Sequence, residues 1–274
     1  MTIKANCKIN IGLNVLERRK DGYHELSTIM YPVVGLYDLL HFEITESSQV
    51  EFIGKGLVID CPTESNLCIK AYNLMQSRFG DRVRGVRITL DKCIPFGAGL
   101  GGGSSDATAV IIAINQLFEL NLDEKQLINL ASEIGSDTPF FVRNTPQLCT
   151  GRGEIMSSIE VDLSGKYLIL IKPEEGVSTR EAYSGVRPSR PTTPLTELIK
   201  LPLEQWQGRI KNDFEPHIFE SHPLLKEIKE SLLAAGAIYA SMSGSGSTIY
   251  GIFDEFSQSK SEQLESYSPY ILQL

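Results

Sequence analysis

One glycine-rich segment, Pro95–Asp106, holds the residues whose types and spacing are best suited to chemistry. Five of its glycines fall within seven positions, and two serines and an aspartate lead into a helical pattern over Ala107–Leu117. Glycine tolerates positive φ and has no Cβ, so the loop can fold tightly and turn its amides inward. With the free N–H groups and positive dipole end of the following helix, these amides would form a cradle for phosphate. Ser104 and Ser105 can cap this helix or give hydroxyls to a phosphate or a metal.

The same segment has three competing interpretations. Gly97-x-Gly99-x-x-Gly102 matches the dinucleotide fingerprint, which is a weak signal when it stands alone. The preceding Val86–Asp91 alternates apolar and polar residues, whereas a Rossmann strand is buried on both faces and reads as a continuous apolar run. No Gly-Lys-Ser/Thr follows the glycines, which argues against a P-loop. A purely structural turn needs one or two glycines, so phosphate binding is favoured over it.

Length and composition limit the class of protein. A chain of 274 residues can bury a substantial core in one large or two moderate domains. Its composition is ordinary for a globular protein, at 42% hydrophobic and 22% charged residues. A net charge of −8 argues against a nucleic-acid partner, because a phosphate backbone needs basic patches. It does not argue against a small phosphorylated ligand.

Cysteine, histidine and apolar patterns predict a soluble, cytoplasmic protein. The five cysteines are scattered and include no C-x-x-C pair, which suits a reducing compartment. The four histidines lack zinc-type spacing, so no dedicated transition-metal site is expected. Met1–Asn14 lacks the apolar core of a signal peptide, and no apolar run reaches membrane-spanning length. We therefore expect no membrane partner.

Strand and helix patterns are mixed along the chain, which favours an α+β fold. The predicted strands are Ala5–Val15, Thr28–Val34, Leu39–Thr45, Val50–Ile53, Val86–Leu90, Phe140–Val142, Tyr167–Ile171, Ala237–Met242 and Thr248–Phe253. The predicted helices are Leu67–Phe79, Ala107–Leu117, Gln126–Ile134 with Asp123 as its cap, and Leu224–Ala235. A weak break near Ile155–Lys166 separates two halves.

Two charged residues outside the glycine segment could move a proton. Lys8 lies on the first predicted strand, where its commoner fate is a solvated lysine. Asp137 follows a predicted helix end, where on its own a turn or capping aspartate is the favoured interpretation. If the two lie close together, the lysine keeps the carboxylate ionised, and the carboxylate can accept a proton from a substrate hydroxyl. A second glycine turn, Ser243–Gly246, is either structural or faces the first.

Several motifs resemble the GHMP kinases, the family that includes galactokinase, homoserine kinase and mevalonate kinase. Pro95–Asp106 resembles their phosphate loop and Ser241–Thr248 their C-terminal glycine motif. The likeness runs from about Lys4 to Phe253. It is closest to the branch that phosphorylates a cytidine-diphosphate-linked methylerythritol, and four segments carry that match: Lys8-Ile9-Asn10, Arg18–His24, Gly135–Pro139 and Asn212–Glu215.

This resemblance implies a fold and a reaction. The fold is a two-domain GHMP kinase fold, with a domain like ribosomal protein S5 domain 2 at residues 1–155 and a ferredoxin-like α/β plait at 156–274. The reaction is phosphoryl transfer from ATP, with Mg²⁺ carried on the nucleotide, to the 2-hydroxyl of the cytidyl substrate in the non-mevalonate route to isoprenoids. The expected partners are these two small molecules.

The resemblance also assigns roles by position. Asp137 would be the general base with Lys8 as its partner, and Asn10 would lie near the methylerythritol. Tyr23 and Tyr183 would stack on the cytosine, while His24 would hydrogen-bond its edge. The residues expected to hold ATP are Asn66 and Lys92 near the adenine, and Pro95, Gly97, Ala98, Gly99, Leu100, Gly101, Gly102, Gly103, Ser104 and Ser105 around the phosphates.

One local departure and three competing functions complete the interpretation. Asn6-Cys7 precedes Lys8 where the family more often has small residues such as alanine, and we expect Cys7 to be buried and inert.

A GHMP kinase for another alcohol, such as mevalonate or homoserine, is the nearest alternative function, but its substrate would give no reason for the Tyr23-His24 pair. A nucleotide-binding regulatory protein would not need a base, and a dehydrogenase is the most distant alternative.

Overall fold

A computed structural model describes residues 1–58 and 61–274. It forms two compact units, each assembled from separate stretches of the chain. The first unit contains Met1–Cys7, Leu36–Phe96 and Gly101–Thr145, and the second contains Lys8–Gly35, Gly97–Leu100 and Pro146–Leu274. The division into residues 1–155 and 156–274 remains a prediction.

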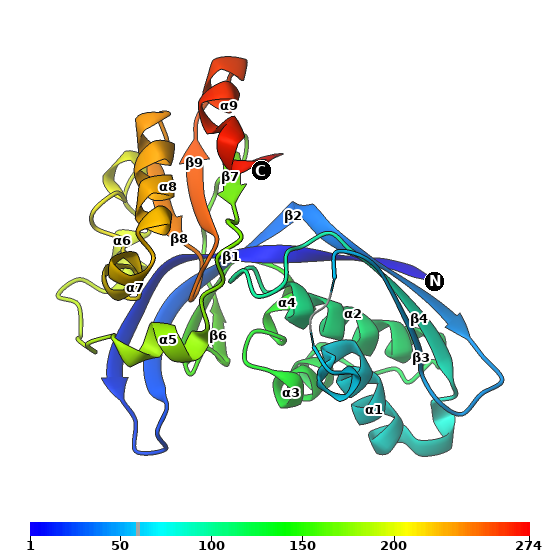
Figure 1. Ribbon diagram of the computed structural model, residues 1–274. Helices are drawn as coiled ribbons and strands as arrows, with labels where there is room; N and C mark the ends of the chain where they lie inside the picture. The colour runs from blue at the N-terminus through cyan, green and yellow to red at the C-terminus, as the bar shows by residue number, and fades with distance from the viewer. Residues whose placement is uncertain (59–60) are drawn as a thin grey trace. The chain divides into compact units, whose positions relative to one another are not determined.

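The first unit packs helices on one face of a small sheet. Within it, the end of β2 (His24–Ile44) pairs antiparallel with β4 (Val86–Lys92), and β4 pairs parallel with β3 (Glu51–Gly56). Helices α1 (Leu67–Phe79) and α2 (Gly102–Leu117) lie side by side against these strands (Figure 1).

Further α-helices and short 3-10 helices complete the first unit. They are η1 (Thr63–Ser65), η2 (Gly80–Arg82), α3 (Glu124–Ile134) and α4 (Phe140–Arg143). Phe42 from β2, Ile88 from β4, Tyr72 from α1 and Ile111 from α2 are fully or almost fully buried in one core. This packing fixes the start of α2, where the glycine-rich segment ends.

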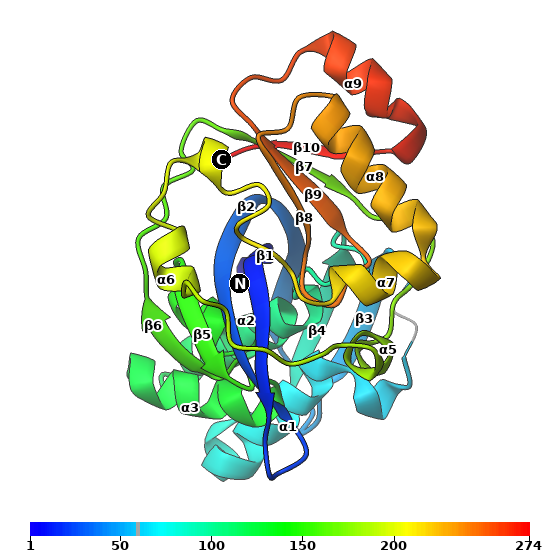
Figure 2. The same cartoon turned by 90° about the vertical axis from the view of Figure 1, so that its left-hand side faces the viewer.

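The second unit contains a four-stranded antiparallel sheet in the order β10-β7-β9-β8 (Figure 2). These strands are β7 (Tyr167–Ile171), β8 (Tyr239–Met242), β9 (Ile249–Phe253) and β10 (Tyr270–Gln273). Most of β1 (Thr2–Arg18) also belongs to this unit, and β1 pairs with β2. In the same unit, the start of β2 pairs with β5 (Gln147–Gly151), which pairs with β6 (Ile155–Ser158).

Helices cover the four-stranded sheet and link its strands. Leu225, Ile228 and Leu232 of α8 (Pro223–Ala234) are completely buried in the core with Ile169 of β7. The other elements are α5 (Thr179–Ser184), α6 (Leu195–Leu198), η3 (Leu203–Gln205), α7 (Glu215–Ser221), α9 (Gln258–Leu264) and η4 (Glu265–Tyr267).

The sequence predicted most elements, and three expectations were wrong. Phe140–Val142 forms part of α4 rather than a strand, and the predicted strands over 28–34 and 39–45 are one continuous β2. Helix α2 starts at Gly102 with Gly101 as its N-cap, so neither serine caps it. The cap of α3 is confirmed, because Asp123 and Gln126 form a reciprocal capping box.

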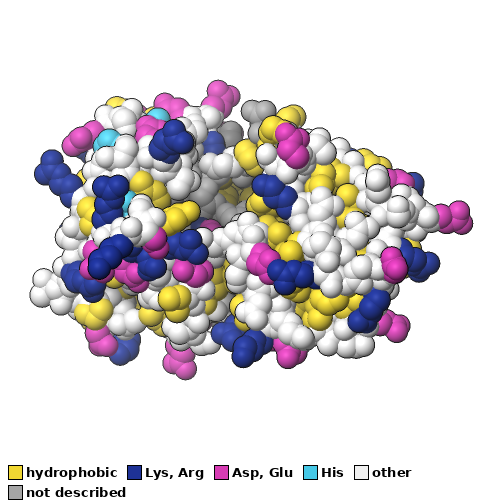
Figure 3. All heavy atoms as spheres, turned by 90° about the horizontal axis from the view of Figure 1, so that it is seen from below, with side chains coloured by type: hydrophobic (Ala, Val, Ile, Leu, Met, Phe, Trp, Pro, Cys, Tyr) yellow, Lys and Arg dark blue, Asp and Glu magenta, His cyan; other side chains and the backbone are white. Residues whose placement is uncertain are grey.

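Two observations concern membrane spans and the surface of the protein. Among the described residues, no helix has both the length and the apolar character needed to cross a membrane. On the face shown in Figure 3, acidic and basic side chains are interspersed with hydrophobic ones.

Candidate active site

The glycine-rich segment uses its glycines where no other residue fits well. Gly97, Gly99 and Gly101 have φ of +63°, +74° and +70°, a region that L-residues rarely adopt. Gly101 ends the loop and is the N-cap of α2. The first backbone amides of any α-helix have no acceptor within the helix. The loop therefore brings backbone donors to the positive end of a helix dipole, as a phosphate site requires.

Within the second unit, the two glycine motifs face each other. The Ser243 hydroxyl donates to the Gly99 carbonyl at 2.8 Å, and the Thr248 amide donates to the Ala98 carbonyl at 3.2 Å. A Cβ added to Gly99 would lie only 2.1 Å from the Ser243 carbonyl oxygen. The turn Ser243–Gly246 therefore faces the glycine-rich loop and helps to hold it, as one of its two interpretations predicted.

Lys8 is buried beside this loop, so its interpretation as a solvated lysine was wrong. Only 2% of Lys8 is exposed, and its ammonium donates to Asn10 Oδ1 at 2.5 Å and to the Gly99 carbonyl at 3.0 Å. Its backbone amide donates to the Leu100 carbonyl at 2.9 Å. Lys8 and Asn10 are two residues apart on β1 and share one face of the strand.

Asn10 is itself held by hydrogen bonds within the second unit. Its amide nitrogen Nδ2 donates to Thr28 Oγ1 at 3.0 Å, and Thr28 in turn donates to the Gly12 carbonyl at 2.5 Å. The Asn10 backbone amide donates to Ser243 Oγ at 3.3 Å. These contacts fix the orientation of the carboxamide that accepts from Lys8.

The burial predicted for Cys7 is confirmed, since it is completely buried.

Asp137 lies in the first unit, on a turn that is fixed to α2. The turn follows α3 and precedes α4, and the neighbouring Thr138 is completely buried. Thr108 of α2 donates its hydroxyl to the Thr138 carbonyl at 2.8 Å. The Asp137 turn is therefore attached to the helix whose start forms the end of the glycine-rich loop. Lys8 and Asp137 belong to different units, and their pairing is part of the proposal below.

Aromatic side chains gather at one end of the second unit. His24 and Tyr183 are stacked with ring centroids 4.9 Å apart, and Tyr183 meets the edge of Phe214 at 4.8 Å. Tyr23 is 56% exposed, and the Arg152 guanidinium lies 4.9 Å from its ring centroid. The structure therefore brings His24 against Tyr183, and it places Tyr23 under Arg152.

The charge state of His24 follows from its surroundings. Partial burial, and then the nearby positive charge of Arg18, lower the pKa of His24 below its usual value. A neutral imidazole at pH 7 has one donor and one acceptor nitrogen, which is the pattern needed to read the edge of a base.

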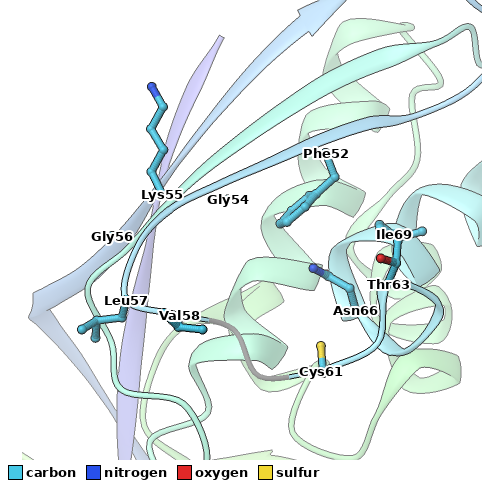
Figure 4. Close-up of a pocket in the computed structure, with 10 residues that line it drawn as sticks. All are labelled: Phe52, Gly54, Lys55, Gly56, Leu57, Val58, Cys61, Thr63, Asn66 and Ile69. Carbon is cyan, nitrogen blue, oxygen red and sulfur yellow. The ribbon is translucent and has the colours of Figure 1, made fainter.

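Asn66 is the N-cap of α1 and lines two cavities of the first unit. Its side-chain oxygen accepts from the Cys68 amide at 2.9 Å, which satisfies one free donor of the helix. The first cavity has a volume of about 370 Å³, and Figure 4 shows the Phe52 ring and the Asn66 amide facing it while Lys55 points away. The second has about 310 Å³ and is lined mostly by apolar surface, with Asn66, Lys92 and Phe96 among its residues.

Lys92 is buried and bonded to two carboxylates of the first unit. Its ammonium donates to Asp38 Oδ2 and, at 2.7 Å, to Asp106 Oδ2. Burial alone lowers the pKa of Lys92, but the two carboxylates outweigh it and raise that pKa overall. Asp106 therefore accepts a hydrogen bond from the buried Lys92 ammonium inside the unit.

Sequence reasoning did not identify Asp38, Thr28 or Arg152. The signal for Asp38 was present, because it is a lone acid in an otherwise apolar stretch, Leu36–Leu40, apart from one tyrosine. Thr28 and Arg152 gave no such signal, since their roles depend on partners that are distant along the chain.

Family models for the GHMP kinases N terminal domain and the GHMP kinases C terminal match residues 66–144 and 195–265. With the fold and the glycine loop, they define the chain as a GHMP kinase and confirm the predicted α+β fold. A 4-diphosphocytidyl-2-C-methyl-D-erythritol kinase of Parabacteroides distasonis is 45% identical over 95% of this chain and 94% of its own length. One of Bacteroides thetaiotaomicron is 44% identical over 91% and 90%. The chain belongs to the 4-diphosphocytidyl-2-C-methyl-D-erythritol kinase family.

Solved structures agree with this assignment. A crystal structure of a 4-(cytidine 5'-diphospho)-2C-methyl-D-erythritol kinase matches with a TM-score of 0.85 and 32% identity, covering 99% of this chain and 98% of that one. The mevalonate kinase of Methanococcus jannaschii matches with a TM-score of 0.74 at 14% identity, over 100% and 98%. The second likeness concerns the fold alone.

Proposed function

We propose that the protein transfers the terminal phosphoryl group of ATP to the 2-hydroxyl of 4-diphosphocytidyl-2-C-methyl-D-erythritol. The products are the 2-phosphate and ADP, and the reaction belongs to the non-mevalonate route to isoprenoids. The main support is the glycine loop, which is closed by the Ser243 turn and contacted by the buried Lys8 ammonium at Gly99. This arrangement occurs in a chain of a kinase family that is named for this substrate.

In this proposal Asp137 is the general base and Lys8 is its partner. Phosphoryl transfer has a loose transition state, so positioning and charge stabilisation supply most of the catalysis. Asp137 takes the proton of the 2-hydroxyl as the new O–P bond forms and the bond to ADP breaks. The Lys8 ammonium favours the ionised carboxylate and stabilises negative charge at the reacting oxygen. Its bonds to Asn10 and Gly99 fix the position of this ammonium.

Cytosine recognition is assigned to the aromatic group of the second unit. Tyr23 and Tyr183 stack on the base, His24 hydrogen-bonds its edge, and Asn10 lies near the methylerythritol. Because the His24 ring covers one face of Tyr183, a base that stacks on that face displaces the imidazole toward the base edge. Stacking provides affinity for any base, and the edge contact provides the identity of the base.

The ATP site is assigned to Asn66, Lys92 and the glycine loop. The cavities beside Asn66 take the adenine, and the segment from Pro95 to Ser105 holds the phosphates. Mg²⁺ enters with ATP and neutralises phosphate charge. Among the described residues, no group of three or more His, Cys, Asp or Glu side chains could hold a metal ion. We place the reaction in the cytoplasm, which the scattered cysteines suit.

Asp137→Asn tests the assigned base. The variant keeps the size of the side chain but cannot accept the hydroxyl proton, so turnover falls by roughly 10²–10⁴-fold while ATP binding stays nearly unchanged. Turnover comes from an ADP-coupled assay, and binding comes from calorimetric titration with ATP. Near-normal turnover by Asp137→Asn would overturn the assignment. Asp91→Asn is a matched control, because its carboxylate is exposed on β4.

A further inference from the structure

Asp38, Lys92 and Asp106 form a buried ion triad inside the first unit. The three residues come from β2, β4 and α2, and none is more than 3% exposed. The antiparallel register pairs Leu39 with Asp91, which places Asp38 opposite Lys92 one step further along. Lys92 donates to both carboxylates. The triad therefore connects three elements through one ammonium.

The triad holds both ends of the glycine loop. At the first end, Asp38 Oδ1 accepts from the amides of Cys93 and Ile94 at 2.6 and 2.8 Å. At the other end, Asp106 lies in the first turns of α2 and accepts from Lys92 at 2.7 Å. Gly102 packs so closely that an added Cβ would lie 3.0 Å from the Lys92 nitrogen. Through Asp38 and Asp106, the two ends of the glycine loop are therefore both connected to the Lys92 ammonium.

The charge of the triad is unbalanced, since two carboxylates share one ammonium. Burial raises the pKa of Asp106 to about 8, although Lys92 opposes this shift. The other titratable groups near it are the thiols of Cys68 on α1, Cys61 and Cys93, and burial raises the pKa of Cys68 well above its usual value.

One polar atom of the triad remains without a partner. Among the described residues, Asp106 Oδ1 is buried and accepts or donates no hydrogen bond. Asp106 also lines the cavity of about 310 Å³ beside Asn66. A buried ion triad is often replaceable by apolar side chains at no loss of stability, so its place at a loop suggests a role beyond stability.

We propose that this triad is a positioning device for ATP: it fixes both ends of the glycine loop and so keeps the loop amides in place for the phosphates. The inference rests on the proposed function, because it takes ATP as the occupant of the loop. Asp38 is a positioning residue here, since it acts through Lys92 and through the Cys93 and Ile94 amides.

Asp38→Asn tests the positioning role in the full-length protein. The variant keeps an oxygen for the two amides but turns an NH₂ group toward Lys92, so the loop loses one anchor. We expect hydrogen exchange of the amides between Pro95 and Ser105 to accelerate. If about a tenth of the molecules then keep the binding geometry, the Kd for ATP rises about tenfold. The KM for the cytidyl substrate stays unchanged, and Asp91→Asn matches the native protein in both readouts.

An Asp38→Asn protein that has a lower melting temperature but native loop exchange and native ATP affinity would overturn the positioning role. The exchange measurement needs no nucleotide, so it evaluates the triad even if the proposed function fails. Failure of the proposed function has its own signature, namely a native protein that neither binds ATP nor turns over the cytidyl substrate.

Asp106→Asn tests the anchor at the α2 end of the loop and remains available if Asp38→Asn does not fold. The variant replaces the carboxyl group that accepts from Lys92 by a neutral amide. We expect faster hydrogen exchange of the amides between Pro95 and Ser105 and a higher Kd for ATP. Native exchange together with a native Kd for ATP would overturn the role of this anchor.

Discussion

The contact between the two glycine motifs makes Gly99 a position where a single added methyl group should disrupt the loop. In Gly99→Ala the new Cβ would lie 2.1 Å from the Ser243 carbonyl oxygen, whereas real Cβ atoms hardly ever come within 3.0 Å of another heavy atom. The backbone must therefore separate by about 1 Å, which breaks the Ser243 and Lys8 bonds to the Gly99 carbonyl. The positive φ of +74° adds strain of about 1–2 kcal/mol.

The effect on catalysis follows from this displacement. A misplacement of about 1 Å in a positioning element costs on the order of 100-fold in rate. We therefore expect Gly99→Ala to lower kcat/KM for ATP by about 100-fold or more. Gly97→Ala is the matched control, because Gly97 also has positive φ but has no heavy atom within 4 Å of an added Cβ. Strain alone limits its loss to roughly tenfold.

Steady-state kinetics with varied ATP, alongside thermal unfolding of both variants, measures these effects. The comparison is made at a temperature where both variants are fully folded, so that loss of stability does not count as loss of rate. Equal kcat/KM values for Gly97→Ala and Gly99→Ala would refute the reasoning, because only Gly99 packs against Ser243.

Three further predictions follow from individual side chains. The bond to Glu181 raises the pKa of His222, so the stability that His222 contributes is complete below about pH 6.5 and is lost as the pH rises through the raised value; melting curves between pH 5 and 9 should show this loss in the native protein and not in His222→Gln. A thiol reagent should label the exposed Cys93 well before the buried Cys7, and mass spectrometry of the peptides gives the order. Tyr183→Ala should raise the KM for the cytidyl substrate by roughly 10–100-fold without changing the KM for ATP, as expected for one lost stacking contact of about 1–3 kcal/mol.

Features that depend on local chemistry were predictable from the sequence. The glycine spacing of the loop and the Asp123 cap of α3 both follow from conformational preferences and hydrogen bonds between close neighbours. The short run Phe140–Val142 was misassigned because three apolar residues are too few to show the periodicity of a helix or a strand. In the structure this run lies in a single helical turn that has Pro139 and Asn144 as its caps.

Features that depend on distant partners were not predictable. Asp38 and Lys92 are 54 residues apart, and Gly99 and Ser243 are 144 apart, so only the folded chain defines these contacts. The burial of Lys8 has the same origin, because its bond to the Gly99 carbonyl spans 91 residues. Motif resemblance predicted the loop and its chemistry, while the anchors that hold the loop came from the structure.

The most direct test of the account is an ADP-coupled assay of the purified protein with ATP, Mg²⁺ and one of three alcohols. These are 4-diphosphocytidyl-2-C-methyl-D-erythritol, mevalonate and homoserine. The account predicts turnover with the cytidyl substrate alone, and its loss in Asp137→Asn. Turnover with mevalonate or homoserine instead would contradict the assigned substrate and the role of Tyr23 and His24, and no turnover with any of them would contradict the proposed activity.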